Sequence, residues 1–376
     1  MKFDEIEISA LDLSVIDGDR GKNYPHKNEL LLDGYCLFLS ASNVTPNGFN
    51  FSNNVFITEE KDSILRNGKL SRNDIVITTR GTVGNVAIYN NSVSYDNVRI
   101  NSGMLIIRCG DGIDNNFLYQ VLRSKYFACQ IGAMQTGSAQ PQLPKSHFLK
   151  MHIPKVPLDK QRKISSILGS IDEKIQCNNE INKNLIEQAQ AIYTDMFISK
   201  SNPVWNEGTL TDLVTVRYGK DHKKLDDGDY PVYGSGGIMR YVERPLYDKE
   251  SVLIPRKGTL NNVMYVNEPF WSVDTMFYTE MKKANVAKFV YHFVKSKDLA
   301  SLNAGSAVPS MTTAILDAMP LLIPDDTTLE RFEKIVAPMY ETIQHNTRET
   351  TNIATIRDTL IPHLMSGEID ISAIKI

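Results

Sequence analysis

The sequence is poor in cysteine and has neither a large charge excess nor a long apolar run. Its 376 residues include four cysteines without a C-x-x-C pair, so we expect reduced thiols and no zinc site. Lys and Arg number 41 and Asp and Glu 44, a formal net charge of −3, which excludes a polybasic protein but not a local basic patch. Apolar runs stay well short of the roughly 18 residues that cross a membrane, and the start, MKFDEIE, is acidic. We therefore expect no membrane span, no signal peptide and a cytoplasmic location.

Motifs of common nucleic-acid enzymes are missing as well. There is no G-x-x-x-x-G-K-[ST] phosphate loop, no Pro-Pro dipeptide and hence no Asn-Pro-Pro-Tyr-type methyltransferase motif, and no nucleophile elbow. The Pro-Asp dipeptide Pro324-Asp325 lacks the downstream acidic-x-Lys of a common nuclease signature. The motif search leaves no reaction to propose, so we name no catalytic residue, and we expect no metal and no cofactor.

An internal repeat organises the chain. Residues 137–141 (GSAQP) return as 305–309 (GSAVP), and Glu173 to Asn178 return as Glu341 to Asn346, both 168 residues further on. Residues 80–83 (RGTV) are echoed by 256–260 (RKGTL), and Ile153-Pro154 by Ile323-Pro324. This ordered series predicts a duplicated half of about 170–190 residues, which is too long for a solenoid repeat.

Two segments have the pattern of long paired helices. Residues 158–198 and 328–365 carry an apolar stripe in alternating steps of four and three residues, which is typical of a helix that packs on another helix. Each helix would be roughly 50–60 Å long at 1.5 Å per residue. A pseudo-twofold axis between the duplicated halves would make the helices antiparallel. The residues expected to pair are Ile164, Leu168, Ile171, Ile175, Asn178, Leu185 and Ile192 in the first helix, and Val336, Met339, Ile343, Asn346, Ile353 and Leu360 in the second.

Two asparagines lie in the middle of this stripe. Asn178 and Asn346 either pair or face polar groups, which would set the register of the helices at some cost in stability, or Asn178 lies in solvent at the edge of the seam. The sequence is compatible with both interpretations.

The remaining residues of each half indicate mixed domains. Short β-rich runs, such as residues 74–79 and 251–254, alternate with Gly, Asn and Asp, and single short helices follow. We predict an α+β fold class: two mixed α/β domains separated by two long antiparallel coiled-coil helices, with an internal pseudo-twofold duplication. The domains are expected at residues 1–152 and 201–322, and the helices at 153–200 and 323–376. Symmetric DNA-binding proteins use such a geometry to engage two half-sites at a set separation.

These features together resemble the specificity subunit of a type I restriction–modification enzyme, over essentially the whole chain. The resemblance rests on residues 136–143 (TGSAQPQL), Ile153-Pro154, residues 161–164 (QRKI) and the closing run 356–369 (IRDTLIPHLMSGEI). It implies that residues 1–152 and 201–322 are two target recognition domains, each of which reads one part of a split DNA sequence. The paired helices would then be spacers that set the gap.

The resemblance also implies a set of partners. These are double-stranded DNA, two methyltransferase subunits docked on the paired helices, and the motor-nuclease restriction subunits of the larger complex. In this family the subunit has no catalytic site of its own. The second copy departs from the first motif, with Val308-Pro309-Ser310 where the first has Gln140-Pro141-Gln142, so a contact by either glutamine would not extend to the second domain.

Charge is distributed unevenly along the chain. Residues 215–263 hold nine basic and seven acidic side chains, whereas residues 325–376 hold five and nine. Positive charge therefore concentrates in the second domain, and the C-terminal helix suits a protein partner better than a phosphate backbone.

Sequence readout in the major groove requires Arg or Lys for guanine and Asn or Gln for adenine, on loops that glycine makes adaptable. The residues that we expect to contact DNA are Arg20, Lys22, Asn23, Arg80, Thr82 and Asn85 in the first domain, and Lys220, His222, Lys223, Lys224, Ser235, Arg240, Arg256, Lys257 and Thr259 in the second. Gly81 and Gly258 are also compatible with plain hairpin turns, and Arg20 with an ion pair to Asp17 or Asp19.

Two other functions remain compatible with the sequence. A stand-alone DNA-reading enzyme with an unrecognised catalytic site would cleave or methylate DNA without partners. A coiled-coil scaffold that binds proteins would select no motif from random duplexes.

Overall fold

A computed structural model describes residues 3–137, 140–302 and 310–371, so the whole second copy of the GSA-x-P motif, 305–309, and residues 138–139 of the first copy lie outside the described residues. The chain divides into two units: unit 1 comprises Met1–Cys177 and Glu349–Ile376, and unit 2 comprises Asn178–Arg348. The division falls inside both long helices, α5 (Leu158–Tyr193) and α9 (Asp326–Ser366). Each unit therefore contains a segment of each helix.

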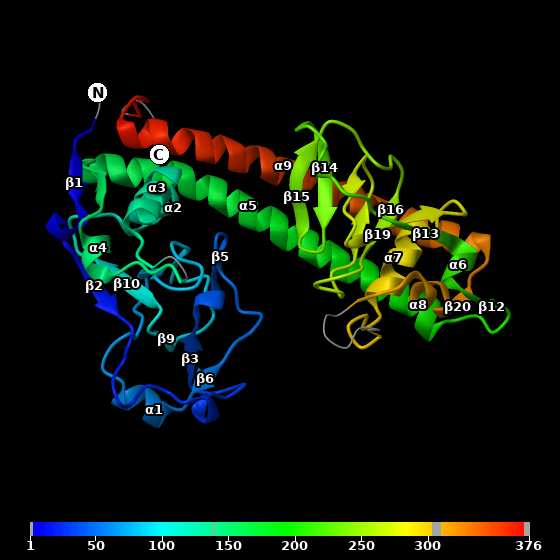
Figure 1. Cartoon of the computed structure of the whole chain (residues 1–376), viewed down its shortest axis with the longest axis horizontal. Coiled ribbons are helices and arrows are strands. Elements are labelled where there is room, and N and C mark those ends of the chain that lie inside the picture. The colour runs from blue at the N-terminus through cyan, green and yellow to red at the C-terminus, as the bar shows by residue number, and fades with distance from the viewer. Residues whose placement is uncertain (1–2, 138–139, 303–309, 372–376) are drawn as a thin grey trace. The chain divides into compact units, whose positions relative to one another are not determined.

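Unit 1 is a mixed α/β domain (Figure 1). Its strands are β1 (Glu5–Glu7), β2 (Leu13–Asp17), β3 (Cys36–Leu39), β4 (Val44–Thr45), β5 (Gly48–Phe49), β6 (Phe56–Ile57), β7 (Ile75–Thr78), β8 (Val86–Ile88), β9 (Val98–Ile100), β10 (Met104–Cys109) and β11 (His152–Pro154). Its short helices are α1 (Glu59–Ile64), α2 (Asn115–Arg123), α3 (Lys125–Met134) and α4 (Lys145–Leu149), with 3₁₀ turns at Ile8–Ala10, Lys27–Glu29 and Ala41–Asn43. The strands form an antiparallel sheet β2-β10-β7-β8, a sheet β6-β3-β9, and the pairs β1-β11 and β4-β5.

Unit 2 repeats this organisation. Its strands are β12 (Asn206–Thr209), β13 (Val214–Tyr218), β14 (Tyr230–Gly234), β15 (Gly237–Val242), β16 (Ser251–Pro255), β17 (Met264–Val266), β18 (Trp271–Ser272), β19 (Met276–Met281) and β20 (Pro320–Ile323). Its short helices are α6 (Leu210–Leu213), α7 (Ala287–Lys295) and α8 (Thr313–Asp317), and a π-helical turn, Thr194–Ser199, follows α5. The sheets are β13-β19-β16-β17, β15-β14-β18 and β12-β20.

The correspondence between the units confirms the duplication. The four-stranded sheets share one strand order, and the parallel pair β3/β9 of unit 1 recurs as β14/β18 in unit 2. Helix α8 starts at Thr313, 168 residues after the first residue of α4, Lys145. The spacing found in the sequence motifs is therefore also the spacing of structural elements.

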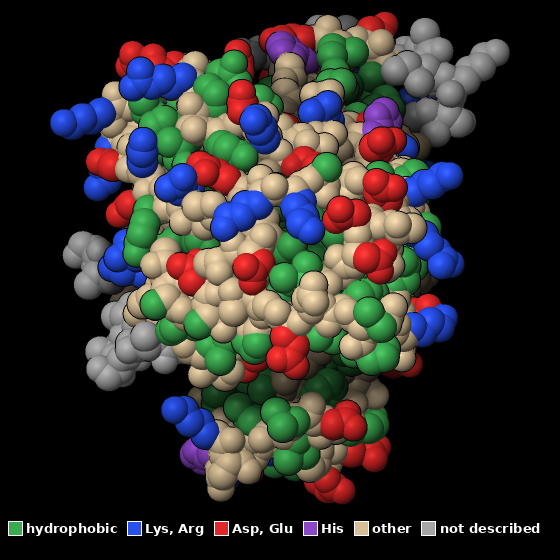
Figure 2. All heavy atoms as spheres, turned by 90° about the vertical axis from the view of Figure 1, so that its right-hand side faces the viewer, with side chains coloured by type: hydrophobic (Ala, Val, Ile, Leu, Met, Phe, Trp, Pro, Cys, Tyr) green, Lys and Arg blue, Asp and Glu red, His purple; other side chains and the backbone are tan. Residues whose placement is uncertain are grey.

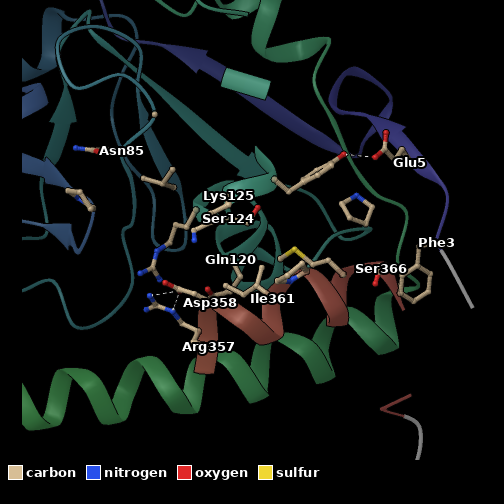
Figure 3. A pocket seen from close by; sticks show the side chains of 18 of the residues that line it. Phe3, Glu5, Asn85, Gln120, Ser124, Lys125, Arg357, Asp358, Ile361 and Ser366 are labelled. Carbon is tan, nitrogen blue, oxygen red and sulfur yellow. Dashed lines mark hydrogen bonds and ion pairs between the residues drawn. The ribbon is translucent and has the colours of Figure 1, made fainter. Parts of the chain in front are cut away.

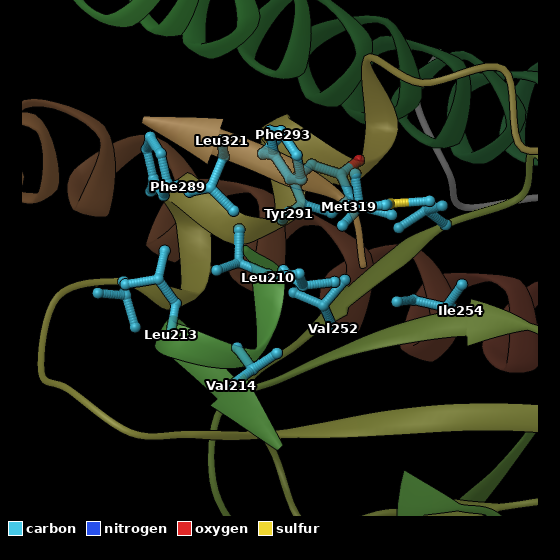
Figure 4. Close-up of a cluster of buried hydrophobic side chains, with 14 of the residues drawn as sticks. Leu210, Leu213, Val214, Val252, Ile254, Phe289, Tyr291, Phe293, Met319 and Leu321 are labelled. Atoms are coloured by element: carbon cyan, nitrogen blue, oxygen red, sulfur yellow. The ribbon is translucent and has the colours of Figure 1, made fainter. Parts of the chain in front are cut away.

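The central strands are apolar throughout because both of their faces are buried. Successive side chains of a strand point to opposite faces of its sheet. In β7, Ile75 and Ile77 pack in the core beneath the helices, whereas Val76 packs between the two sheets. In β16, Val252 and Ile254 belong to a core that also contains residues of α7, α5 and α9 (Figure 4). Leu253 belongs to a second core, which lies on the side of the sheet β15-β14-β18.

The stripe residues of the long helices are buried or half-buried, and many belong to the cores of the units. In unit 1, Ile164 and Leu168 of α5 share a core with Ile361, Leu364 and Met365 of α9. In unit 2, Ala189 and Tyr193 of α5 share a core with Phe332, Val336 and Tyr340 of α9. Within each unit, residues with higher numbers in α5 contact residues with lower numbers in α9. The segments are therefore antiparallel and lie side by side (Figure 1).

Both mid-stripe asparagines are buried, so the interpretation of Asn178 as a solvated edge residue is wrong. Asn178 is 0% and Asn346 7% exposed. Asn346 Nδ2 donates to Oδ1 of Asn182 at 3.0 Å, and Asn182 Nδ2 donates to Thr347 Oγ1 at 3.3 Å. The amide that pairs with Asn346 therefore lies one helical turn beyond Asn178.

The long helices begin later than the ranges 153–200 and 323–376 suggested. Ile153 and Pro154 belong to β11, which pairs with β1, so α5 starts only at Leu158. Asp325 caps α9 by accepting the Thr328 N–H at 2.8 Å. Within the described residues, no helix has the combination of length and apolarity that crossing a membrane requires.

Candidate nucleic-acid interface

The loops after β2 and β13 have the same construction. A Cβ on Gly18 would lie 2.0 Å from the carbonyl oxygen of Asn101, and a Cβ on Gly219 would lie 2.0 Å from the carbonyl oxygen of Val273. Only glycine permits so close an approach. In unit 1 the chain that leaves β2 is therefore held against the loop that precedes β10. In unit 2 the chain that leaves β13 is held in the same way against the loop that precedes β19.

In unit 1, the turn after β7 is fastened to the same loop. The N–H groups of Thr79 and Arg80 both donate to the carbonyl of Gly103, at 2.7 and 3.2 Å. Arg80 also forms a β-bridge with Gln142, and Gly81 has a φ of +74°. The Arg80 side chain is consequently exposed at the tip of a turn whose backbone is restrained on two sides.

In unit 2, the turn after β16 is fastened in the same way. The N–H groups of Arg256 and Lys257 both donate to the carbonyl of Thr275, at 2.9 and 3.2 Å. Lys257 forms a β-bridge with Ser310, and Gly258 has a φ of +84°. Lys257 is thus the structural equivalent of Arg80, and Gly258 that of Gly81. Both glycines do turn the chain, and each turn also presents a basic side chain.

One guanidinium group lies beside each turn. In unit 1, Arg20 Nη2 donates to the carbonyl of Ser102 at 3.3 Å and to Asp17 Oδ1 at 3.1 Å. Its side chain is still 54% exposed. The ion pair that the sequence left open is therefore the one with Asp17.

Asp19, the other candidate partner of Arg20, has a different role. It is 8% exposed and accepts the N–H of Gly21 and the N–H of Arg66, each at 2.7 Å. The pKa of Asp19 lies below its ordinary value, chiefly because the Gly21 N–H donates a hydrogen bond to the carboxylate. Asp19 therefore links two backbone segments of unit 1.

In unit 2, Arg256 occupies the corresponding position. Its Nη1 donates to the carbonyl of Asp274 at 3.2 Å, and its Cζ lies 5.4 Å from the ring centroid of Tyr218. Tyr218 is 51% exposed and packs edge-on against Phe277, with ring centroids 5.0 Å apart. The Tyr218 ring therefore lies against one side of the guanidinium of Arg256, a residue that is half-buried.

Three more predicted residues of unit 2 lie in this region: Lys220, Ser235, and the exposed Thr259, which directly follows Gly258. The Lys220 N–H donates to the carbonyl of Ser272 at 2.8 Å. The Ser235 carbonyl accepts from Asn262 Nδ2 at 2.8 Å, and a Cβ on Gly258 would lie 2.7 Å from Ser235 Oγ. We call Arg20, Arg80 and Thr82 loop cluster 1, and Lys220, Ser235, Arg256, Lys257 and Thr259 loop cluster 2.

Other predicted residues are engaged within the chain. Asn23 Nδ2 donates to the carbonyl of Ile64 at 3.3 Å, and Asn85 Nδ2 to the carbonyl of Val44 at 2.9 Å. Arg240 Nη2 donates to Asp227 Oδ1 at 2.6 Å, which ties β15 to the loop between β13 and β14. Each interaction engages one side-chain nitrogen, and the Arg240 side chain is only 30% exposed, against 54% for Arg20.

The loop after Gly219 carries the remaining basic candidates. Lys223 and Lys224 are exposed, as is Lys22 of unit 1, and within the described residues their ammonium groups make no hydrogen bond. His222 differs, because its Nδ1 is buried and has no hydrogen-bond partner among the described residues. The three lysines thus suit contact with phosphate.

The distribution of charged and metal-binding side chains bears on what the molecule can bind. On the face that Figure 2 draws, basic and acidic side chains are interspersed. Within the residues described, no group of three or more His, Cys, Asp or Glu side chains lies close enough together to hold a metal ion. That face therefore offers no continuous basic surface to a polyanion.

A cavity of about 550 Å³ lies within unit 1 between α2, α3 and the end of α9 (Figure 3). Its charged lining is largely neutralised by Asp172 of α5, which accepts from Gln120 at 2.6 Å, Arg123 at 3.0 Å and Arg357 at 2.7 Å. Asn85 lines this cavity too. The Asp172 cluster fastens α2 to both long helices.

Two contributors to the site had no sequence signal of their own. Tyr218 belongs to no motif that the sequence analysis identified. Asp172 is an ordinary acidic residue on the predicted helix. An alignment of the two halves that matches the end of β2 with the end of β13 places Tyr218 opposite Asp17. That alignment would have drawn attention to Tyr218.

Comparison with known proteins identifies the family. The sequence profile described as "Type I restriction modification DNA specificity domain" matches residues 12–188 and again residues 203–354. The chain is similar to the type I restriction enzyme MjaIX specificity subunit of Methanocaldococcus jannaschii, at 22% identity over 78% of this chain and 77% of that protein. It is also similar to the EcoprrI specificity subunit of Escherichia coli, at 22% identity over 93% and 92% of the two chains.

A solved structure shares the fold. The crystal structure of a type I restriction–modification S subunit from M. genitalium matches with a TM-score of 0.59 at 18% identity, over 99% of this chain and 97% of that one. The predicted architecture of two mixed domains with two long helices, and the resemblance noted in the sequence, are thereby confirmed.

Proposed function

The chain belongs to the type I restriction–modification DNA specificity family, and on that basis we propose that it reads a split duplex DNA target, one part with each unit. The observation that carries the proposal is the presence of loop clusters 1 and 2 at equivalent positions of the duplicated sheet. Each cluster offers exposed basic groups on restrained backbone, which is what readout of base edges and phosphates requires.

The long helices would act as spacer and docking surface. Both are continuous α-helices across the division between the units, and the proposal assigns to them the gap between the two parts of the target. We expect two methyltransferase subunits on these helices, followed by restriction subunits in the larger complex. The excess of acidic over basic side chains in residues 325–376, nine against five, favours protein over DNA as the ligand of that helix. The proposed place of action is the cytoplasm, where a bacterial or archaeal genome is accessible.

The specificity role requires no chemistry from this chain. Methyl transfer and cleavage would be carried out by the partners, and the chain would need neither metal nor cofactor. Incubation of the purified chain alone with duplex DNA, magnesium and a methyl donor is expected to give no cut strand and no methylated base. Either product would contradict a non-catalytic role.

Selection from a pool of randomised duplexes tests the main proposal. The chain bound to its methyltransferase partner is expected to enrich two short motifs separated by a constant number of base pairs. Insertion or deletion of one base pair in the gap should then lower affinity at least tenfold, because one helical step rotates the half-sites by about a tenth of a turn. Enrichment of one continuous motif, or of none, would refute the proposal.

A further inference from the structure

Each loop cluster contains two kinds of basic side chain. Arg20 of unit 1 and Arg256 of unit 2 are both anchored, because each donates to the carbonyl of the residue that stands two before β10 or β19, Ser102 or Asp274. Arg80 and Lys257 are not anchored: within the described residues, neither side chain makes a hydrogen bond or ion pair, and both are exposed.

The anchored arginines reach equivalent carbonyls from different loops. Arg20 comes from the loop after β2, whereas Arg256 comes from the turn after β16. A second group fixes each one: the carboxylate of Asp17 for Arg20, and the ring of Tyr218 for Arg256. Asp17 and Tyr218 are the last residues of the corresponding strands β2 and β13. The two units thus place a guanidinium at one position by different means.

The unanchored side chains occupy one backbone position. Arg80 and Lys257 each donate their N–H to the loop carbonyl at 3.2 Å and each precede a glycine with positive φ. One unit has arginine there and the other has lysine. A position that accepts either side chain requires a positive charge, and not the planar fork of a guanidinium.

We infer that the anchored arginines, Arg20 and Arg256, read a base in their respective half-sites, whereas Arg80 and Lys257 make equivalent contacts to the phosphate backbone. The inference rests on the proposed function and assigns roles within it. A fork fixed from two sides is oriented for the paired acceptors O6 and N7 of guanine. A mobile ammonium or guanidinium serves a phosphate oxygen as a point charge.

The test compares charge-preserving with charge-removing variants in the complex with the methyltransferase partner. Arg20→Lys and Arg256→Lys keep the charge but lose the fork, so each should lose about tenfold or more of the discrimination at one base pair of one half-site. Arg80→Lys and Lys257→Arg should change affinity and base preference by less than about twofold. Arg80→Ala and Lys257→Ala should weaken binding to all sequences alike and reduce the slope of log affinity against log salt by about 0.9.

Arg217→Lys is the matched control. Arg217 precedes Tyr218 on β13, so its side chain leaves the opposite face of the strand, where it pairs with Glu280 at 3.1 Å. This variant should leave base preference unchanged. Base preference is a ratio between sequences and does not depend on the folded fraction, so partial unfolding of a variant cannot imitate the result.

The outcomes separate the inference from the proposed function. If the wild-type complex selects no split motif, the proposed function fails. If it does select one, but Arg256→Lys and Arg20→Lys keep the full base preference, the assignment of the anchored arginines is wrong. If Lys257→Ala or Arg80→Ala changes preference at a single base pair, the assignment to phosphate is wrong.

Discussion

Removal of the Asp172 carboxylate should loosen unit 1 without affecting unit 2. The carboxylate of Asp172 accepts from Gln120, Arg123 and Arg357, and these side chains come from α2 and α9. The side chain of Asp172 is 25% exposed, and those of Arg123 and Arg357 are 16% and 15% exposed. An Asp172→Ala variant therefore leaves two poorly solvated guanidinium groups without their shared anion.

The size of the effect follows from that burial. Removing one partner of a buried ion pair costs about 3–5 kcal/mol. Water can reach part of this cluster and recovers some of the loss, so we expect about 2–4 kcal/mol for unit 1. A loss of about 2–4 kcal/mol corresponds to a roughly 30- to 1000-fold larger open population of unit 1. Amide hydrogens of residues 115–123 and 350–360 that exchange through this opening should exchange faster by the same factor.

Hydrogen exchange with mass spectrometry measures this peptide by peptide. Residues 287–295 of α7 in unit 2 should keep their wild-type rates. Asp195→Ala is the matched control, because Asp195 pairs with Lys200 in an exposed pair, 54% and 72% accessible, that we expect to contribute less than about 1 kcal/mol. Wild-type exchange of α2 in Asp172→Ala would refute the assigned role of the cluster.

Two further predictions concern unit 2. Burial lowers the pKa of His292 to about 4 from 6.5, so between these values the unfolded chain binds a proton that the folded chain does not. The stability of unit 2 should fall by about 2–3 kcal/mol as pH is lowered from 7 to 4.5, and His292→Gln should lack this part of the loss in urea unfolding at the two pH values; identical pH dependence in both proteins would contradict it. Asn182→Leu alone should destabilise the helix pair by about 1–3 kcal/mol because it leaves the buried Asn346 amide without its acceptor, whereas Leu at both positions should recover most of that loss. Additive losses in the double-mutant cycle would show that the two amides are not coupled.

The features that sequence periodicity predicted are those that depend on local spacing. The stripe from Ile164 to Ile192 identified α5 because residues three and four apart share a helix face, whatever the tertiary context. The duplication was visible because a shift of 168 residues brings motifs and elements into coincidence. Both signals are independent of how distant segments pack.

The features that the sequence could not predict depend on which residues, distant in the sequence, become hydrogen-bond partners in the fold. Asn85 and Arg240 have the residue types of base readers, but Asn85 Nδ2 donates to the Val44 carbonyl, and the Arg240 side chain, paired with Asp227, is only 30% exposed. Asn178 and Asn182 are one turn apart on the same face, and only the packing selects Asn182 as the partner of Asn346. Equivalent residues of a repeat can likewise sit on different loops, as Arg20 and Arg256 do.

The division of the chain inside both long helices has a consequence for biosynthesis. The core of unit 1 includes Ile361, Leu364, Met365 and Ile371, and the N–H of Phe3 donates to the carbonyl of Ser366 at 3.1 Å. All of unit 2, Asn178–Arg348, is synthesised between Cys177 and the return of the chain to unit 1 at Glu349. At roughly 5–20 residues per second, the ribosome needs on the order of 10–40 s to supply it. The unit that emerges first is thus the last to be completed, and a nascent chain must keep it from aggregating in the interval.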